Sequence, residues 1–511
     1  MNRRGETPDV PGAAGSAGPP DASGGRSQGL TDELPAPLRT AIETRLREHH
    51  TQGLALCAFD AHGMVFAGGV GNADLARSEP VTPETIFRAA SISKLLTATL
   101  ALRLVEQGHL DLAAPVNDHL PPELRILDRD GHPATSPVAM LLSHTSGLPS
   151  GVRGASPGNA AVSYVANQGR VRNLADAVSG LRLVRAPGER IVYSNPAYNV
   201  IGHVAAGIVG LPFEAAVREQ VLGPLGMVGA EFTPQRSGPG IATPYGSIVP
   251  PAVGGRSAAG LRLVATPMGG LTTSVVELAR FGRMVLGGGS IDGQQILGPD
   301  VLADATSMHA TNHPDLDVGY GLGFKVRTWH GRRVIGHDGN MPGVATQLLI
   351  APEDGVGVAV LTNGYALSVP HEAAALALEH LLGDTSTGPD TSTGPDPEVL
   401  DSAQSATAAA FGRTAAGTYR QLDASPPGIV GRLNEAGIRV RVTHEVGGRL
   451  RVDGNPGSGG PAWLLPTVAP GRYRVAAGVD DDTSAVIEEH ADGMHLWLGH
   501  TTHLFRRARR R

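Results

Sequence analysis

The chain has 511 residues, of which 41% are hydrophobic and 18% charged, and its formal net charge is -6. This composition is that of a globular protein long enough for two or three domains. With no strongly basic domain it argues against a nucleic-acid binder, and we interpret the basic ending FRRARRR as a solvated tail.

Residues 1–30 consist mainly of Gly, Pro, Ala, Ser and Asp, and we expect them to form a disordered leader. No apolar stretch follows the early arginines, so neither a secretory nor a twin-arginine signal is complete. No segment reaches the roughly twenty apolar residues of a membrane helix. We therefore expect a cytoplasmic protein with no membrane partner. Cys57 is the single cysteine, which excludes internal disulfides, and its apolar run GLALCAF predicts a buried position.

Residues 31–382 predict one unit with strands near both of its ends. A helix with Leu38, Ile42 and Leu46 on one face comes first, followed by the strand-like runs GLALCAFD and GMVFAGG. Helical patterns dominate from Ser91 to about Leu286. Strand patterns then return in YGLGFKVRTW, RRVIGH, GVATQLLIA and GVGVAVLTN, and an apolar helix, HEAAALALEHLLG, closes the unit. The pattern predicts an α+β fold, with an antiparallel sheet built from distant segments and a functional site where the helical insert meets it.

Residues 383–398 contain the hexapeptide DTSTGP twice in tandem, and such polar, Pro-punctuated sequence is typical of a linker. Residues 399–511 carry several short alternating segments, among them GIRVRVTHEV and MHLWLGH. Their spacing predicts a small antiparallel β-barrel or sandwich.

Lys94 is one of only two lysines in the chain, the other being Lys325, although lysine and arginine together number 42. A solvated lysine could be replaced by arginine at little cost, so a lysine that persists suggests chemistry that guanidinium cannot perform. Ser91 precedes Lys94 by three residues at the start of a predicted helix, and residues i and i+3 share a helical face. The first turn offers free N–H groups to a developing oxyanion, and burial would favour the neutral amine of Lys94 as a base.

Two further segments hold candidate residues. Tyr193 and Asn195 come just before an apolar helical run, and taken alone they are better explained as a tyrosine packed at a loop and an asparagine capping a helix. His337, Asp338 and Gly339 lie at the end of one predicted strand and before the next, where a histidine is usually structural and a glycine usually marks a turn.

Taken together, these motifs resemble the serine β-lactamase and penicillin-binding-protein family. S-I-S-K at 91–94, Y-S-N at 193–195 and H-D-G at 337–339 occur in the family's order. The flanking segments LLSHTSGLP, PMGGLTTSVVELARF and YGLGF are similar to those of the branch near class C β-lactamases and bacterial esterases. The resemblance covers about residues 38–382, and the C-terminal domain is similar to lipocalin-like domains appended to some members.

The resemblance implies a role for each motif. Ser91 would be the acylated nucleophile, and Lys94 and Tyr193 would share the proton transfers. Asn195 would orient Lys94 or bind the substrate amide, and His144 would belong to a shaping loop. His337 would complete the catalytic set and Gly339 would line the substrate site, while the backbone N–H groups of Ser91 and Asn340 would form the oxyanion hole.

Two features depart from other members. Y-S-N stands where many have S-D-N, so Tyr193 rather than a dedicated glutamate would take part in activating water. H-D-G replaces the K-T-G of many β-lactamases and carboxypeptidases, and a histidine is mostly neutral at pH 7. The loss of that cation weakens the expectation of efficient β-lactam hydrolysis.

The sequence leaves three functions open. The leading prediction is a serine hydrolase or acyltransferase that works through a Ser91 acyl-enzyme on an ester, amide or thioester of a small molecule or peptide. A stand-alone thioesterase of the penicillin-binding-protein type, which would release or cyclise a peptide from a carrier protein, is a more specific alternative. A non-catalytic ligand-binding or scaffold protein is the third. No Cys/His cluster, H-E-x-x-H or phosphate-binding loop motif occurs, so we expect neither a metal nor another cofactor.

Overall fold

The computed structural model describes residues 33–151, 172–233, 235–246, 263–383 and, with gaps in its loops, 402–507. The predicted disordered leader and the tandem DTSTGP repeat lie outside these residues.

The larger unit is built on an eight-stranded antiparallel sheet with the strand order β3-β2-β1-β13-β12-β11-β10-β9. The N-terminal strands thus lie beside the last strand of the unit, as the sequence predicted. The strands are β1 (Gly53–Asp60), β2 (Met64–Asp74), β3 (Glu79–Pro80), β9 (Val318–Tyr320), β10 (Lys325–Trp329), β11 (Arg332–Met341), β12 (Val344–Ala351) and β13 (Val356–Thr362).

Two strand predictions need correction. The run YGLGFKVRTW forms two strands, β9 and β10, because the chain turns at Gly323, whose positive φ of 100° favours glycine. Strand β11 continues to Met341, so His337 to Gly339 lie inside this strand and not at its end. The ladder with β12 extends through this segment and holds it in the sheet.

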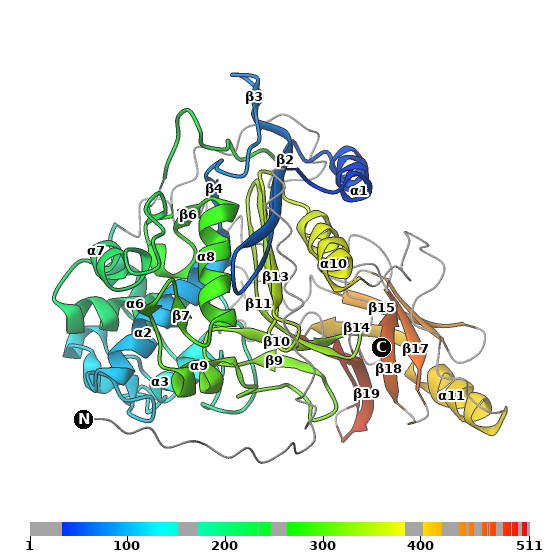
Figure 1. Cartoon of the computed structure of the whole chain (residues 1–511). Coiled ribbons are helices and arrows are strands. Elements are labelled where there is room, and N and C mark those ends of the chain that lie inside the picture. Colours follow the sequence, from blue (N-terminus) through cyan, green and yellow to red (C-terminus); the bar gives the residue numbers. More distant parts are fainter. Residues whose placement is uncertain are drawn as a thin grey trace, which may run out of the picture.

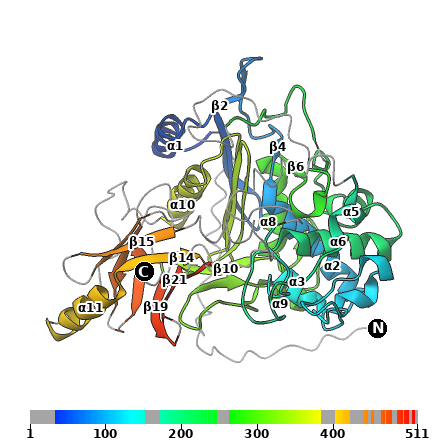
Figure 2. The same ribbon diagram turned by 180° about the vertical axis from the view of Figure 1, so that it is seen from behind.

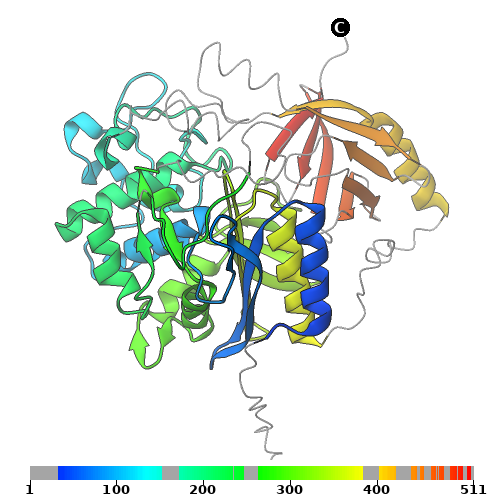
Figure 3. The same cartoon turned by 90° about the horizontal axis from the view of Figure 1, so that it is seen from above.

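Strand β1 shows why the sheet is buried on both faces. Ala55, Cys57 and Phe59 belong to one apolar cluster, whereas the alternating Leu54 and Leu56 belong to another. The buried position predicted for Cys57 is confirmed. Helices α1 (Ala36–Glu48) and α10 (Ser368–Leu382) cover one face, and the helical insert covers the other (Figure 3).

The insert between β3 and β9 supplies most helices of the unit. Its larger elements are η1 (Ala90–Ile92), α2 (Ser93–Glu106), α3 (Val138–Leu142), α5 (Leu174–Val178), α6 (Asn195–Val209), α7 (Phe213–Val217), η5 (Thr266–Met268), α8 (Val275–Leu286) and α9 (Pro299–Thr306). Shorter turns are η2 (Val116–His119), η3 (Pro122–Leu124) and η4 (Arg218–Leu222), and small strands are β4 (Phe87–Arg88), β5 (Glu231–Phe232), β6 (Leu271–Thr273), β7 (Ser290–Ile291) and β8 (Gln294–Gln295).

The C-terminal part is a closed eight-stranded antiparallel barrel, preceded by helix α11 (Ser402–Ala415). Its strands are β14 (Gly417–Gln421), β15 (Arg439–His444), β16 (Leu450–Asp453), β17 (Ala462–Pro466), β18 (Arg472–Ala476), β19 (Ser484–His490), β20 (Gly493–Leu498) and β21 (His503–Arg507). The predicted barrel is thereby confirmed. It lies near the β9–β10 edge of the large sheet in two opposite views (Figure 1 and Figure 2).

Within the described ranges, no single helix is long and apolar enough to cross a membrane. One bent pair, Asn195–Val209 with Phe213–Leu222, has sufficient length and composition only when the two are joined across a 78° bend.

The domain boundaries remain predictions, and a truncated chain tests them. We expect a chain that ends at Gly383 to stay soluble and to unfold cooperatively, because the large sheet and both of its covering layers are complete before this residue. Thermal unfolding and size-exclusion chromatography, with the full chain as the control, provide the measurement. Aggregation of the shortened chain would show that the barrel completes the surface of the larger unit.

Candidate active site

Ser91 lies in the short 3-10 turn η1, immediately before helix α2, and its side chain is partly exposed. The preceding residue, Ala90, has a left-handed φ of 48°, which costs a residue with a Cβ on the order of 1 kcal/mol. Three hydrogen bonds hold this turn. Ser93 Oγ donates to Ala90 O at 2.5 Å, Thr346 Oγ1 donates to Ala89 O at 3.0 Å, and Ala89 N donates to Leu271 O at 2.9 Å.

Lys94 lies one helical turn after Ser91, and its residue is 0% exposed. Its Nζ lies 3.1 Å from Ser91 Oγ and 2.7 Å from Met268 O. The amine also lies 4.9 Å from the ring centre of Tyr193 and 5.6 Å from that of Tyr198. Burial lowers the pKa of Lys94 to about 7, and the negative charge of Asp338 opposes this shift.

The segment 266–271 packs against the start of helix α2 and supports Ser91 and Lys94. Besides the Met268 carbonyl, Pro267 O accepts a hydrogen bond from Thr97 Oγ1 at 2.8 Å. Leu271 N donates to Ser93 Oγ at 2.9 Å. Because these contacts join the segment to successive turns around Ser91 and Lys94, they fix the amine relative to the hydroxyl.

Tyr193 lies at the entrance to helix α6, and His144 holds the segment that carries it. Val192 N donates to His144 O at 2.8 Å, and Ser194 N donates to His144 Nδ1 at 3.0 Å. The rings of His144 and Tyr193 lie 4.4 Å apart. Burial raises the pKa of Tyr193 above its ordinary value of 10.0, and a hydrogen bond with Ser91 opposes this shift. Tyr193 is therefore a neutral phenol at pH 7, and Lys94 is the better base of the two.

Strand β11 approaches the Ser91 turn at Gly339. A Cβ at this glycine would lie 2.6 Å from Ala89 O and 2.3 Å from Thr346 Oγ1, so a side chain here would push the strand away from the turn. Asn340 follows directly, and its Nδ2 donates to Tyr365 O at 3.0 Å. The geometry thus gives Gly339 a packing role. Its contact with substrate and the oxyanion role of the Asn340 N–H stay predictions.

His337 is 2% exposed, and its Nδ1 lies 2.5 Å from Asp338 O. That oxygen accepts, so Nδ1 carries the proton. Burial lowers the pKa of His337 to about 4, which leaves the ring neutral at pH 7. The ring centre lies 6.0 Å from that of Tyr193.

Lys325 also lies near this motif, with its Nζ 3.4 Å from Asp338 Oδ1. Strand β10 lies between β9 and β11, and the Lys325 side chain forms an ion pair with Asp338. Lys325 and nearby imidazoles lower the pKa of Asp338, although burial by itself would raise it.

Asn195 is the first residue of helix α6, and the preceding Ser194 is its N-cap, with Oγ accepting a hydrogen bond from Ala197 N at 3.2 Å. The alternative of Asn195 as the cap is therefore wrong. Across the described part of the chain, no hydrogen bond joins Lys94 to Asn195, since the amine is bound to Ser91 and Met268. A role of Asn195 toward the substrate amide stays a prediction.

Comparison with known proteins decides the family. The Beta-lactamase family model matches residues 38–383. The chain belongs to the beta-lactamase family. Penicillin-binding protein 4 of Amycolatopsis lactamdurans is 29% identical over 349 residues, which cover 62% of this chain and 82% of that protein. Membership of this family indicates a serine hydrolase in the general sense.

Solved structures extend the likeness in fold. The octameric penicillin-binding protein homologue from Pyrococcus abyssi has a TM-score of 0.59 and 23% identity, and the match covers 92% of this chain and 99% of that one. A D-stereospecific amidohydrolase from Streptomyces sp. has a TM-score of 0.56 and 23% identity, covering 69% and 99%. The first match includes most of the C-terminal barrel, whereas the second has the length of a single beta-lactamase-family domain.

The structure brings Ser91, Lys94 and Tyr193 together, as sequence reasoning predicted. His144, which the resemblance placed in a shaping loop, holds the Tyr193 segment, and the carbonyl of Met268 is a support that the sequence reasoning missed. Both lie in segments that carry the family resemblance, HTSGLP and PMGGL. The sequence therefore marked both segments as relevant. It could not show the contact of the Met268 carbonyl, because any residue has a backbone carbonyl.

Substitution of Lys94 tests whether it is the base. We expect Lys94→Arg and Lys94→Met to lower kcat by roughly 10²-fold to 10⁴-fold, because neither side chain can accept the Ser91 proton. The measurement is ester hydrolysis by variants whose unfolding midpoints show that they are folded. Lys94→Met is included because the larger guanidinium of arginine could overpack this buried position and lower activity for that reason alone. Lys325→Arg is the matched control and should stay near wild type. More than about a tenth of wild-type kcat in Lys94→Arg would exclude the base.

The pH profile should report the same amine. Since only neutral Lys94 can act as a base, kcat/KM should rise about tenfold per pH unit on the acid side and level off above a midpoint near the Lys94 pKa of about 7. Asp338→Asn removes a negative charge that favours the protonated amine, so it should move the midpoint to lower pH. Asp453→Asn, in the barrel, is the control. A midpoint that Asp338→Asn leaves unchanged or raises would contradict the assignment.

Proposed function

We propose that this chain transfers the acyl group of an ester, amide or thioester to Ser91 and then to water or another acceptor. The observation that carries the proposal is the buried Lys94 amine, 3.1 Å from Ser91 Oγ, with its pKa lowered to about 7. A serine hydroxyl becomes a competent nucleophile when an adjacent base of this kind takes its proton. The preserved geometry disfavours the non-catalytic alternative.

The steps follow from these positions. Ser91 Oγ attacks the substrate carbonyl carbon as its proton passes to Lys94 Nζ, and the resulting oxyanion accepts hydrogen bonds from the Ser91 and Asn340 N–H groups. The tetrahedral intermediate collapses and expels the leaving group, which takes up the proton through the Tyr193 hydroxyl. Water then attacks the acyl-enzyme by the reverse sequence and releases the acid.

The neutral ring of His337 favours a substrate that carries no charge where it meets this residue. Many β-lactamases carry a lysine there, and a lysine suits a substrate carboxylate, whereas His337 is neutral with a pKa of about 4. Lys325, the remaining lysine, is paired with Asp338. We therefore propose that esters are better substrates than β-lactams.

A peptidyl thioester on a carrier protein is the second form of the proposal. The observation that favours it is the raised pKa of Tyr193, which makes this phenol a weak proton donor. A thiolate leaves without protonation, unlike an amine, so a thioester would place the smallest demand on Tyr193. A carrier protein would then be the partner.

Purified protein should turn over a p-nitrophenyl ester with a kcat/KM at least about tenfold above that for a chromogenic cephalosporin, because His337 offers no cation to the cephalosporin carboxylate. A peptidyl thioester assayed in parallel tests the second form. A cephalosporin preferred by about tenfold would overturn the ester assignment.

The same preparation should gain one adduct from a fluorophosphonate probe, and Ser91→Ala should abolish the mass shift. Labelling at another residue, or no labelling of folded protein, would exclude the acyl-enzyme mechanism itself.

A further inference from the structure

A loop at residues 311–317 connects the candidate active site to the C-terminal barrel. Its base is closed by Ala310 and Tyr320, which exchange backbone hydrogen bonds of 3.0 and 2.9 Å. The ring of Tyr320 lies 4.7 Å from that of His144 and 6.3 Å from that of Tyr193. One end of the loop therefore belongs to the wall of the candidate site.

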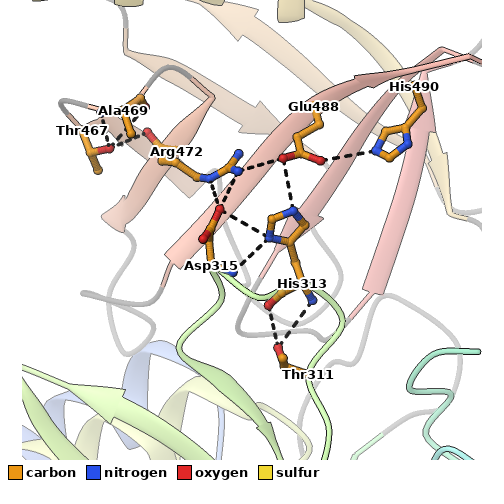
Figure 4. Close-up of polar contacts among 8 residues, drawn as sticks. All are labelled: Thr311, His313, Asp315, Thr467, Ala469, Arg472, Glu488 and His490. Carbon is orange, nitrogen blue, oxygen red and sulfur yellow. Dashed lines mark hydrogen bonds and ion pairs between the residues drawn. The ribbon is translucent and has the colours of Figure 1, made fainter. Parts of the chain in front are cut away.

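The tip of the loop contacts the barrel through a charged network (Figure 4). Arg472 of β18 contacts both Asp315 Oδ2, at 2.5 Å, and Glu488 Oε1, at 2.8 Å. Glu488 of β19 also lies 3.2 Å from His313 Nε2. Asp315 N donates to His313 Nδ1 at 3.1 Å, so Nε2 carries the proton that points to Glu488. A network of charge-assisted bonds fixes geometry better than an isolated surface pair does.

Apolar packing accompanies the ion pairs. Leu316 and Val318 of the larger unit form one buried cluster with Val486 and Trp497 of the barrel. The His313 ring lies 5.1 Å from that of Trp497. This apolar contact lies beside the ion pairs and joins the same loop to the barrel.

From the loop, one contact leads to the catalytic tyrosine. Asn312 Oδ1 accepts a hydrogen bond of 2.8 Å from the N–H of Ile191, two residues before Tyr193. The loop is braced internally, because Thr311 Oγ1 lies 3.0 Å from both His313 O and Val318 O. The position of Asn312 thus depends on a loop that the barrel holds.

We propose that the barrel acts as an intramolecular clamp, in which Arg472 and Glu488 hold the 311–317 loop so that Asn312 positions the Tyr193 segment for proton transfer. His144 supports this segment from within the larger unit, and Asn312 supports it from the barrel side. Asn312 is a positioning residue, since it acts through Ile191. The expected effect on kcat rests on the proposed function. The expected effect on the position of the Tyr193 segment rests on the contacts alone.

The kinetic test compares full-length variants on the p-nitrophenyl ester. Asn312→Ala and Arg472→Ala should each lower kcat and the rate of fluorophosphonate labelling by roughly 5-fold to 50-fold, with KM changed less than about twofold. The double variant should be no slower than Asn312→Ala, because both changes break one path. Asn312→Asp keeps the acceptor oxygen and should recover most of the rate. Arg451→Ala, which breaks the Arg451–Asp453 ion pair inside the barrel, is the matched control.

Hydrogen exchange tests the clamp without any substrate. In Arg472→Ala, the Ile191 amide should exchange about tenfold or more faster than in wild type, while Arg451→Ala should leave it unchanged. Unchanged exchange in Arg472→Ala would overturn the clamp, as would kcat values of wild type in both Asn312→Ala and Arg472→Ala. A wild-type chain without labelling at Ser91 would instead refute the proposed function, and the exchange result would still decide the clamp.

Discussion

The Lys94 amine lies 0% exposed between the Ser91 hydroxyl and the Met268 carbonyl, and the chemistry of the site depends on this burial. In water a lysine stays protonated at neutral pH, but desolvation lowers the Lys94 pKa to about 7 and so makes a neutral amine available. The space that excludes water is formed by packing between α2, α6 and the η5 segment. In the proposed mechanism, the fold therefore supplies the base as well as its position. Arginine could not replace it, because a guanidinium keeps its proton in the same environment.

Tyr193 illustrates a second constraint, since residues 191–194, just before helix α6, are themselves neither helix nor strand. His144 holds this segment by a carbonyl, a ring nitrogen and a ring face, and Asn312 holds it at Ile191. The first support comes from the helical insert, while the second comes from a loop in contact with the barrel. A linear chain can thus place one phenol through two parts that are far apart in sequence. The same arrangement gives the C-terminal domain a physical route to the site without contributing a catalytic group.

The predictions from sequence succeeded where one element or a repeated pattern carried the information. The S-x-x-K spacing placed Ser91 and Lys94 on one side of a helix start, and strand periodicity gave the sheet and the barrel. They failed where neighbours decide the outcome. No local pattern indicates the pairing of Lys325 with Asp338, and β11 continues past His337 to Met341 because the ladder with β12 extends this strand. Ser194 caps helix α6 in place of Asn195, a difference of one residue that local propensity does not resolve.

The sequence by itself determined the fold class and the chemical types at the candidate site, because helix and strand periods, turn residues and the S-x-x-K spacing are local properties of the chain. The sequence also indicated a neutral side chain at His337, because a histidine is mostly neutral at pH 7. Only the tertiary structure decided which polar atoms lie within hydrogen-bond distance of one another, such as Lys94 Nζ and Met268 O. The Lys94 pKa depends on how completely distant segments exclude water, and the link from Arg472 through the 311–317 loop to Ile191 joins residues about 280 positions apart. Such contacts carry no periodic signal, because their energy arises only when the two units pack together.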